Sequence, residues 1–217
     1  MRALLALALA PLLLLGLYRF VPPPITPVMV VRWLGGDGLD RRWAALADLP
    51  AAVAAAVIAA EDSRFCSHFG FDWVEIQSAL DQWRKGEALR GASTLSMQTG
   101  KNLFLWPGRS WLRKGAEAYL TVAIEVLWSK RRIVEVYLNI AEWGSGIFGI
   151  EAAARRHFGK PARALTRREA ALLAAALPNP RQFSPGRPSA YLRERADTIV
   201  MRIDQLGPLL DCVRPVK

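Results

Sequence analysis

The sequence contains few of the residues that bind metals or form redox centres. Its 217 residues include two cysteines and two histidines, and no C-x-x-C pair occurs. His68 and His157 form no metal-ligand pattern with each other, and a histidine in the setting of His68 is usually structural. Cys66 and Cys212 either form one disulfide in an oxidising compartment or remain small buried side chains. The composition therefore argues against metal or redox chemistry.

The chain also lacks the patterns of nucleic-acid-binding proteins. It has no zinc-finger spacing and no run of basic residues interleaved with aromatics. Its formal net charge is nevertheless +10, with basic residues spread along the chain. This balance favours an anionic partner such as an acidic membrane surface or a phosphorylated substrate, with a generic basic surface as the alternative.

Long apolar runs are absent except at the start of the sequence. Ala3–Leu17 carries no charge, and apolar residues continue around Arg19 to position 21. A membrane-spanning helix needs roughly 20 apolar residues. No small-x-small cleavage site follows, so an uncleaved transmembrane signal anchor over residues 1–21 is favoured over a cleaved signal peptide.

A proline-rich stretch separates this segment from the rest of the chain. Pro22, Pro23 and Pro24 are typical of a stiff extended spacer, which we place at residues 22–44. Within it, Val28–Leu34 is β-branched and predicts one short strand.

The remaining sequence has helical periodicity and contains no internal repeat or sustained heptad. It predicts one mainly α domain at residues 45–206, followed by a short tail at residues 207–217. The expected helices are Ala51–Glu61, Trp73–Trp83, Thr94–Asn102, Trp111–Trp128, Lys130–Asn139, Gly149–His157, Arg167–Ala176 and Ala190–Leu206.

Two carboxylates stand at an unfavourable position. Glu61 and Asp62 follow the alanine-rich run Ala51–Ala60, where the end of a helix carries partial negative charge. Either the helix continues past them, or an arginine pairs with them, or a carboxylate is kept there with a raised proton affinity. The last is what a general base near neutral pH needs.

Polar side chains share one face of the next predicted helix. In GASTLSMQTGKN, Ser93 or Thr94 can cap a helix on which Gln98, Lys101 and Asn102 follow at i, i+3 and i+4. Two amides and an ammonium on one face can bind a phosphate or a sugar. A solvated helix face is the alternative.

Further cations follow within fourteen residues of Lys101, namely Arg109, Arg113 and Lys114. If these side chains converge, they form an anion site suited to pyrophosphate. Arg113 and Glu117 are also spaced for an ordinary i,i+4 ion pair, which contributes only a few tenths of a kcal/mol.

These segments resemble glycosyltransferase family 51, the peptidoglycan glycosyltransferases. EDSRFCSHFGFD resembles the first motif of the family, GASTLSMQTGKN the second, RKGAE the third and SKRRIVEVYLN the fourth. The last helix, with Arg195, is similar to the fifth. All five occur in order. Where the family often has two glutamines, this chain has Met97 and Gln98, and Met97 falls on a different helix face.

The resemblance implies a lysozyme-like, mostly helical fold with a cleft between a globular lobe and a membrane-proximal lobe. It implies polymerisation of peptidoglycan glycan chains: the lipid-pyrophosphate-linked growing glycan is transferred to the 4-hydroxyl of lipid II with inversion, and polyprenyl pyrophosphate leaves. Glu61 would be the general base.

The same resemblance assigns the other site residues. Glu117 would assist the leaving group, with a divalent cation, Mg or Mn, left open as a cofactor. The substrate-binding residues would be Ser93, Thr94, Gln98, Lys101, Asn102, Arg109, Arg113 and Lys114, of which Lys101, Arg109 and Arg113 would hold the pyrophosphate.

The implied partners are lipid II, the lipid-linked glycan, the membrane and other cell-wall synthesis proteins, with no nucleic acid. The expected location is the bacterial cytoplasmic membrane, with a single span and the catalytic domain on the outer side. No S-x-x-K motif occurs, so the monofunctional form is expected. A lysozyme-like lytic glycosidase and a non-catalytic, membrane-tethered scaffold are the alternatives.

Overall fold

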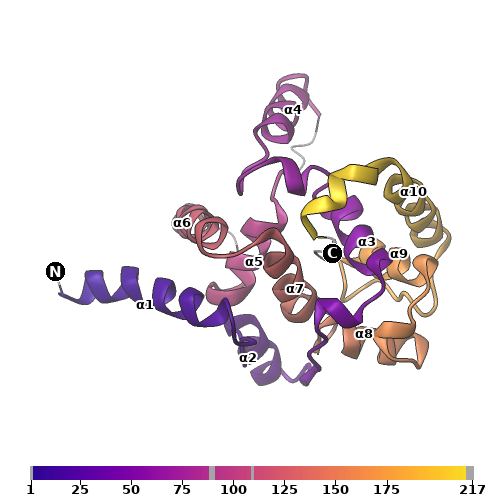
Figure 1. Ribbon diagram of the computed structural model, residues 1–217, viewed down its shortest axis with the longest axis horizontal. Coiled ribbons are helices and arrows are strands. Elements are labelled where there is room, and N and C mark those ends of the chain that lie inside the picture. The colour runs from indigo at the N-terminus through magenta and orange to yellow at the C-terminus, as the bar shows by residue number, and fades with distance from the viewer. Residues whose placement is uncertain (1, 88–90, 109, 214–217) are drawn as a thin grey trace.

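The computed structural model describes residues 2–87, 91–108 and 110–213, and these residues are mainly helical (Figure 1). The α-helices are α1 (Arg2–Tyr18), α2 (Pro27–Leu34), α3 (Ala51–Glu61), α4 (Trp73–Arg84), α5 (Leu95–Phe104), α6 (Trp111–Leu127), α7 (Lys130–Ile140), α8 (Ile150–Phe158), α9 (Arg167–Ala176) and α10 (Ala190–Leu206). Short 3-10 helices are η1 (Leu46–Asp48), η2 (Phe65–Ser67), η3 (Ala162–Ala164) and η4 (Gly207–Val213).

The eight helices predicted from the sequence are confirmed, each within about two residues. The predicted strand at Val28–Leu34 is wrong, because this segment forms helix α2. Thr26 caps the helix by accepting a hydrogen bond from the Met29 backbone N–H, and Pro27 occupies the first turn, where its missing N–H is not needed. These start signals outweigh the β-branched valines.

A small sheet joins the start of the domain to its centre. Its strands are β1 (Asp40–Arg41), β2 (Glu142–Gly144) and β3 (Ile147–Phe148), in the order β1-β3-β2. Strand β1 pairs parallel to β3, and β2 pairs antiparallel to it. The segment before the predicted domain therefore contributes a strand to the folded body.

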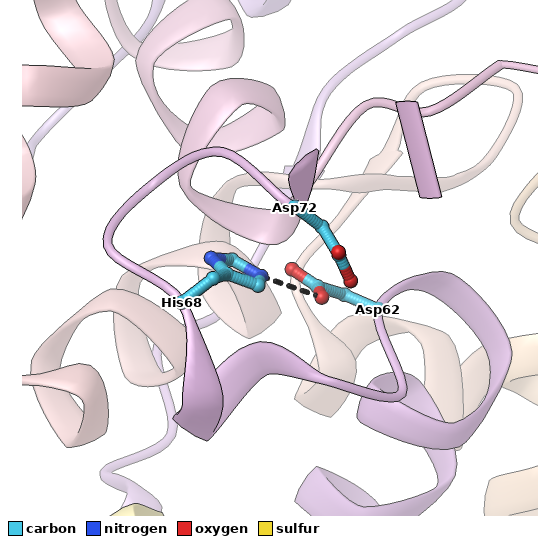
Figure 2. Close-up of side chains that lie close together, drawn as sticks. All are labelled: Asp62, His68 and Asp72. Atoms are coloured by element: carbon cyan, nitrogen blue, oxygen red, sulfur yellow. Dashed lines mark hydrogen bonds and ion pairs between the residues drawn. The ribbon is translucent and has the colours of Figure 1, made fainter. Parts of the chain in front are cut away.

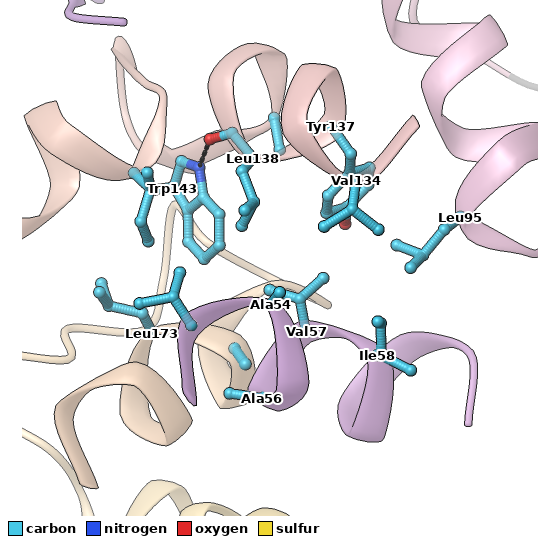
Figure 3. Packing of buried hydrophobic residues seen from close by; sticks show 14 of the residues in the cluster. Ala54, Ala56, Val57, Ile58, Leu95, Val134, Tyr137, Leu138, Trp143 and Leu173 are labelled. Carbon is cyan, nitrogen blue, oxygen red and sulfur yellow. Dashed lines mark hydrogen bonds between the residues drawn. The ribbon is translucent and has the colours of Figure 1, made fainter. Parts of the chain in front are cut away.

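Helix α3 lies at the centre of the hydrophobic core. It packs against α9 and α10, and Figure 3 shows its side chains facing Val134 and Leu138 of α7 and Leu173 of α9. Helices α3 and α9 are rich in buried alanine, whose small side chains allow helix axes to approach closely. Because α3 is held on several sides, its last residue, Glu61, has a fixed position.

The N-terminal helix α1 packs against α6 in the described residues. The Trp128 indole N–H donates to the backbone carbonyl of Leu15 over 2.8 Å, and the Arg132 guanidinium donates to that of Tyr18. Among the residues that the structure describes, none of the helices has the length and apolar character needed to cross a membrane.

The two cysteines form a disulfide, which the sequence left undecided. Cys66 in η2 is bonded to Cys212 in η4, across 146 residues of sequence. The bond fastens the C-terminal η4 to the loop that follows Glu61.

Removing this disulfide should lower the thermal stability of the protein. In the chain-entropy model, closing so long a loop lowers the entropy of the unfolded chain and so raises the free energy of unfolding by roughly 4–5 kcal/mol at most. We expect the Cys66→Ser/Cys212→Ser variant to melt about 10 °C lower than the oxidised wild type, measured by circular dichroism. Reductant should lower the melting temperature of the wild type but not of the variant, and equal melting temperatures would contradict this role.

Candidate active site

Glu61 ends helix α3, as predicted, and its carboxylate is partly shielded from solvent. Gln98 Nε2 donates to Glu61 Oε2 over 2.9 Å. Burial raises the pKa of Glu61 above its ordinary value and the neighbouring Asp62 carboxylate adds to this effect, while the Gln98 hydrogen bond and the charges of Arg195 and Lys101 oppose it. A carboxylate with a raised pKa is suited to accept a proton.

Asp62 has a different role from Glu61. Its Oδ2 accepts a hydrogen bond from the backbone N–H of Leu95, the first residue of α5, and its Oδ1 lies 2.9 Å from His68 Nε2 (Figure 2). The helix therefore does not continue past the acids, and none of the arginines that the structure describes pairs with Asp62. Instead, Asp62 connects the end of α3 to the start of α5. The contact of His68 with Asp62 is consistent with the structural interpretation of this histidine.

One group of side chains in the described part of the chain has metal-ligand spacing. Ligand atoms of Asp62, His68 and Asp72 lie within 4.8 Å of one another (Figure 2). Both Asp62 oxygens are already hydrogen-bonded, Asp72 Oδ1 caps α4 by accepting from two backbone N–H groups, and Arg64 Nε lies 3.3 Å from Asp72 Oδ2. These contacts explain the cluster as a support for the loop that follows Glu61, and a metal does not fit without breaking them.

Gly70 and Thr94 fix this loop to α5 as well. Gly70 has a φ of +83°, and a Cβ there would lie 2.7 Å from Thr121 Cγ2, so glycine is required by both backbone conformation and space. The Thr94 hydroxyl donates to the Gly70 carbonyl over 2.6 Å and accepts from the Met97 N–H. Thr94 is buried, so the structure places it as a cap of α5.

The polar face predicted on α5 is confirmed. Gln98, Lys101 and Asn102 all line a pocket of about 380 Å³. Arg113 of α6 lines the same pocket. Met97 points elsewhere and is buried.

Three of the predicted cations converge beside this pocket; we call Lys101, Arg113 and Lys114 the basic cluster. Burial lowers the pKa of Lys101, with repulsion from Arg113 adding to it and Glu61 opposing it. Burial also lowers the pKa of Lys114, together with repulsion from Arg113 and Lys101. Lys114 Nζ lies 3.4 Å from the Ser93 hydroxyl oxygen. Arg109 lies outside the described residues.

Glu117 is enclosed by the basic cluster. Its side chain is 4% exposed, with one oxygen paired to Arg113 and the other 3.0 Å from Lys114 Nζ. The Arg113–Glu117 pair is therefore buried, unlike the solvated i,i+4 pair that the spacing alone suggested. Both oxygens of Glu117 already have cationic partners, so a divalent cation does not fit there without displacing them.

Residues that no sequence motif indicated reach the site from other elements. Tyr137 of α7 donates its hydroxyl hydrogen to Gln98 Oε1 over 3.2 Å. Arg32 of α2 and Glu142 of β2 form an ion pair at 3.1 Å and line the 380 Å³ pocket. The segment of Arg32 is predicted to be a strand in a spacer, which gives no indication of a site residue. Tyr137 lies on the apolar face of α7, where its position in the sequence is typical of a core residue.

Comparisons with known proteins identify the family to which the chain belongs. The family model described as transglycosylase matches residues 29–204. Proteins named biosynthetic peptidoglycan transglycosylase are similar over nearly the whole chain. That of Rhodospirillum centenum is 60% identical over 205 residues, covering 94% of this chain and 89% of the relative. That of Pseudomonas aeruginosa is 52% identical, covering 91% and 88%, and that of Caulobacter vibrioides is 49% identical, covering 96% and 92%. The chain belongs to the transglycosylase family.

Proposed function

We propose that this protein is a peptidoglycan glycosyltransferase that polymerises glycan chains from lipid II. One observation carries the proposal: Gln98 of α5 donates to the Glu61 carboxylate, whose pKa is raised, and Lys101 of the same helix lies with Arg113 and Lys114 in the basic cluster. The names of relatives that are about half or more identical over most of this chain support the same activity.

In the proposed reaction, Glu61 removes the proton from the 4-hydroxyl of lipid II. The 4-oxygen forms a bond to the anomeric carbon of the lipid-linked glycan, with inversion. The bond from that carbon to the pyrophosphate oxygen breaks, and polyprenyl pyrophosphate leaves with the electron pair. Negative charge that develops on the leaving oxygen is stabilised by Lys101 and Arg113, and Glu117 orients the Arg113 guanidinium.

We also propose that the N-terminal segment anchors the protein in the bacterial cytoplasmic membrane, with the site on the outer side. The uncharged run Ala3–Leu17 supports this assignment. Leu13, Leu17 and Phe20 are exposed along and after α1, where an apolar surface favours contact with lipid.

The lytic alternative is less consistent with the basic cluster. A lytic glycosidase breaks a bond between two sugars, so its leaving group carries no pyrophosphate that needs several cations. Two other carboxylates near the proposed site already have partners: Asp62 contacts His68 and the Leu95 N–H, and Glu117 is paired with Arg113 and Lys114.

The function is tested by presenting both substrates to the purified full-length protein in detergent. We expect labelled lipid II to be converted into polymer that lysozyme digests, and purified peptidoglycan to remain intact. Soluble fragments released from peptidoglycan, without polymer, would support the lytic alternative. The absence of both products would support the scaffold.

A further inference from the structure

We infer that Tyr137 is a positioning residue that fixes the amide of Gln98 in the one orientation able to donate to Glu61. The inference rests on the proposed function and assigns Tyr137, which also lines the 380 Å³ pocket, a role that it exerts through Gln98. It begins with a chain of two hydrogen bonds, from the Tyr137 hydroxyl to Gln98 Oε1 and from Gln98 Nε2 to Glu61 Oε2.

The surroundings of Gln98 determine which end of its amide faces Glu61. The NH₂ group lies 2.9 Å from Glu61 Oε2 and 3.4 Å from the backbone carbonyl oxygen of Ser93. Both are acceptors, so this side of the amide must carry the hydrogens. The amide oxygen then faces the opposite way, toward the Tyr137 hydroxyl at 3.2 Å. A donor at that position opposes rotation of the amide.

Tyr137 is suited to this task because it is buried in the core and its environment favours the protonated hydroxyl. It is 2% exposed and packs in the core beside Val134 and Leu138 of α7 (Figure 3). Burial raises the pKa of Tyr137 well above its ordinary value, and the nearby Glu61 carboxylate raises it further. The hydroxyl therefore remains a donor throughout the working pH range.

Charged groups reach Glu61 from the elements around it, and a change at Tyr137 leaves their charges in place. Asp62 follows it on α3, Lys101 faces it from α5, and Arg195 faces it from α10. Glu75 of α4 and Arg202 of α10 line the pocket beside it. Loss of the Tyr137 hydroxyl therefore acts on Glu61 through the Gln98 hydrogen bond.

The sign of the effect follows from that bond. A hydrogen bond donated to a carboxylate favours its ionised form. Without the Tyr137 hydroxyl the Gln98 amide is free to rotate, its donation to Glu61 weakens, and the pKa of Glu61 rises further. Because the base must be ionised to act, the acid limb of the pH–rate profile moves to higher pH.

The test is Tyr137→Phe, assayed as kcat and KM for lipid II polymerisation across pH. We expect the acid limb to move up by about 0.5–1 pH unit, with a kcat loss of about three- to tenfold near the limb and little change in KM, as for one neutral hydrogen bond. Tyr191→Phe is the matched control, since it removes the same hydroxyl from an exposed ring on α10. Its profile should coincide with that of the wild type.

A double-mutant cycle separates positioning from packing. Gln98→Met should raise the acid limb, and adding Tyr137→Phe to it should raise it no further. A Tyr137→Phe profile that coincides with the wild type, or shifts that add, would overturn the inference. If Tyr137→Phe does not fold, the pH–rate profile of Gln98→Met decides: an acid limb at the wild-type position overturns the inference, and an acid limb at higher pH supports it. Failure of the wild type to polymerise lipid II would instead reject the proposed function.

Discussion

Glu61→Gln is expected to leave the fold intact and to abolish measurable polymerisation of lipid II. The two side chains have nearly the same shape, and the amide oxygen of the replacement can accept the hydrogen bond that Gln98 now donates to Glu61. The amide cannot accept the proton of the attacking hydroxyl. General base catalysis typically contributes about 10²–10⁴ in rate, so we expect a loss of that size.

The measurement is the initial rate of polymer formation, with the melting temperature by circular dichroism as the check on folding. Burial raises the pKa of Glu61, so its neutral replacement should keep or increase thermal stability at neutral pH. Glu87→Gln is the matched control, because Glu87 is exposed in the loop after α4. Polymerisation at a near wild-type rate by folded Glu61→Gln protein would mean that another group is the base.

The sequence predicted the helices well because their signals are local. The capping box of Thr166 and Glu169 and the alanine-rich pattern of Ala51–Glu61 each define a helix within a few residues. For α2 the β-branched residues predict a strand, whereas the start signal of Thr26 and Pro27 determines the helix. A segment predicted to be an extended spacer gives no indication that Arg32 forms an ion pair with Glu142 at the site.

The part of the site whose side chains lie on a single helix was predictable from the sequence. Spacing alone placed Gln98, Lys101 and Asn102 on one face of α5. The contacts that organise this face are long-range: Asp62 reaches Leu95 across 33 residues, and Tyr137 reaches Gln98 across 39. No local pattern marks such pairs, and only the packing of α3, α5 and α7 brings them together.

Lys101→Met is expected to lose polymerisation without losing stability. Methionine keeps the unbranched apolar stem of lysine and removes only the charge. If Lys101 neutralises the pyrophosphate, removing this contact should cost roughly 2–4 kcal/mol of transition-state stabilisation, a loss of about 30- to 1000-fold in rate. A solvated surface charge would be worth at most about 1 kcal/mol.

The stability of the same variant should move in the opposite direction from its activity. The pKa of Lys101 is lowered by burial and by Arg113, so the charged form is less favourable in the folded than in the unfolded chain. The charged ammonium therefore destabilises the fold, and this effect disappears when the charge is removed. The melting temperature of Lys101→Met should equal or exceed that of the wild type. Opposed changes of this kind are typical of residues kept for function.

Lys85→Met and Lys101→Arg distinguish the loss of this particular charge from the loss of any lysine charge. Lys85→Met removes the charge of an exposed lysine at the end of α4 and should change neither rate nor melting temperature. Lys101→Arg keeps the charge and should retain more activity than Lys101→Met, because leaving-group stabilisation depends first on the cation. The loss of the Lys101 charge also removes one influence that lowers the pKa of Glu61, so the acid limb of Lys101→Met should lie at higher pH than that of the wild type. A folded Lys101→Met protein that loses less than about fivefold in rate, within the range of a surface charge, would show that the pyrophosphate is bound elsewhere.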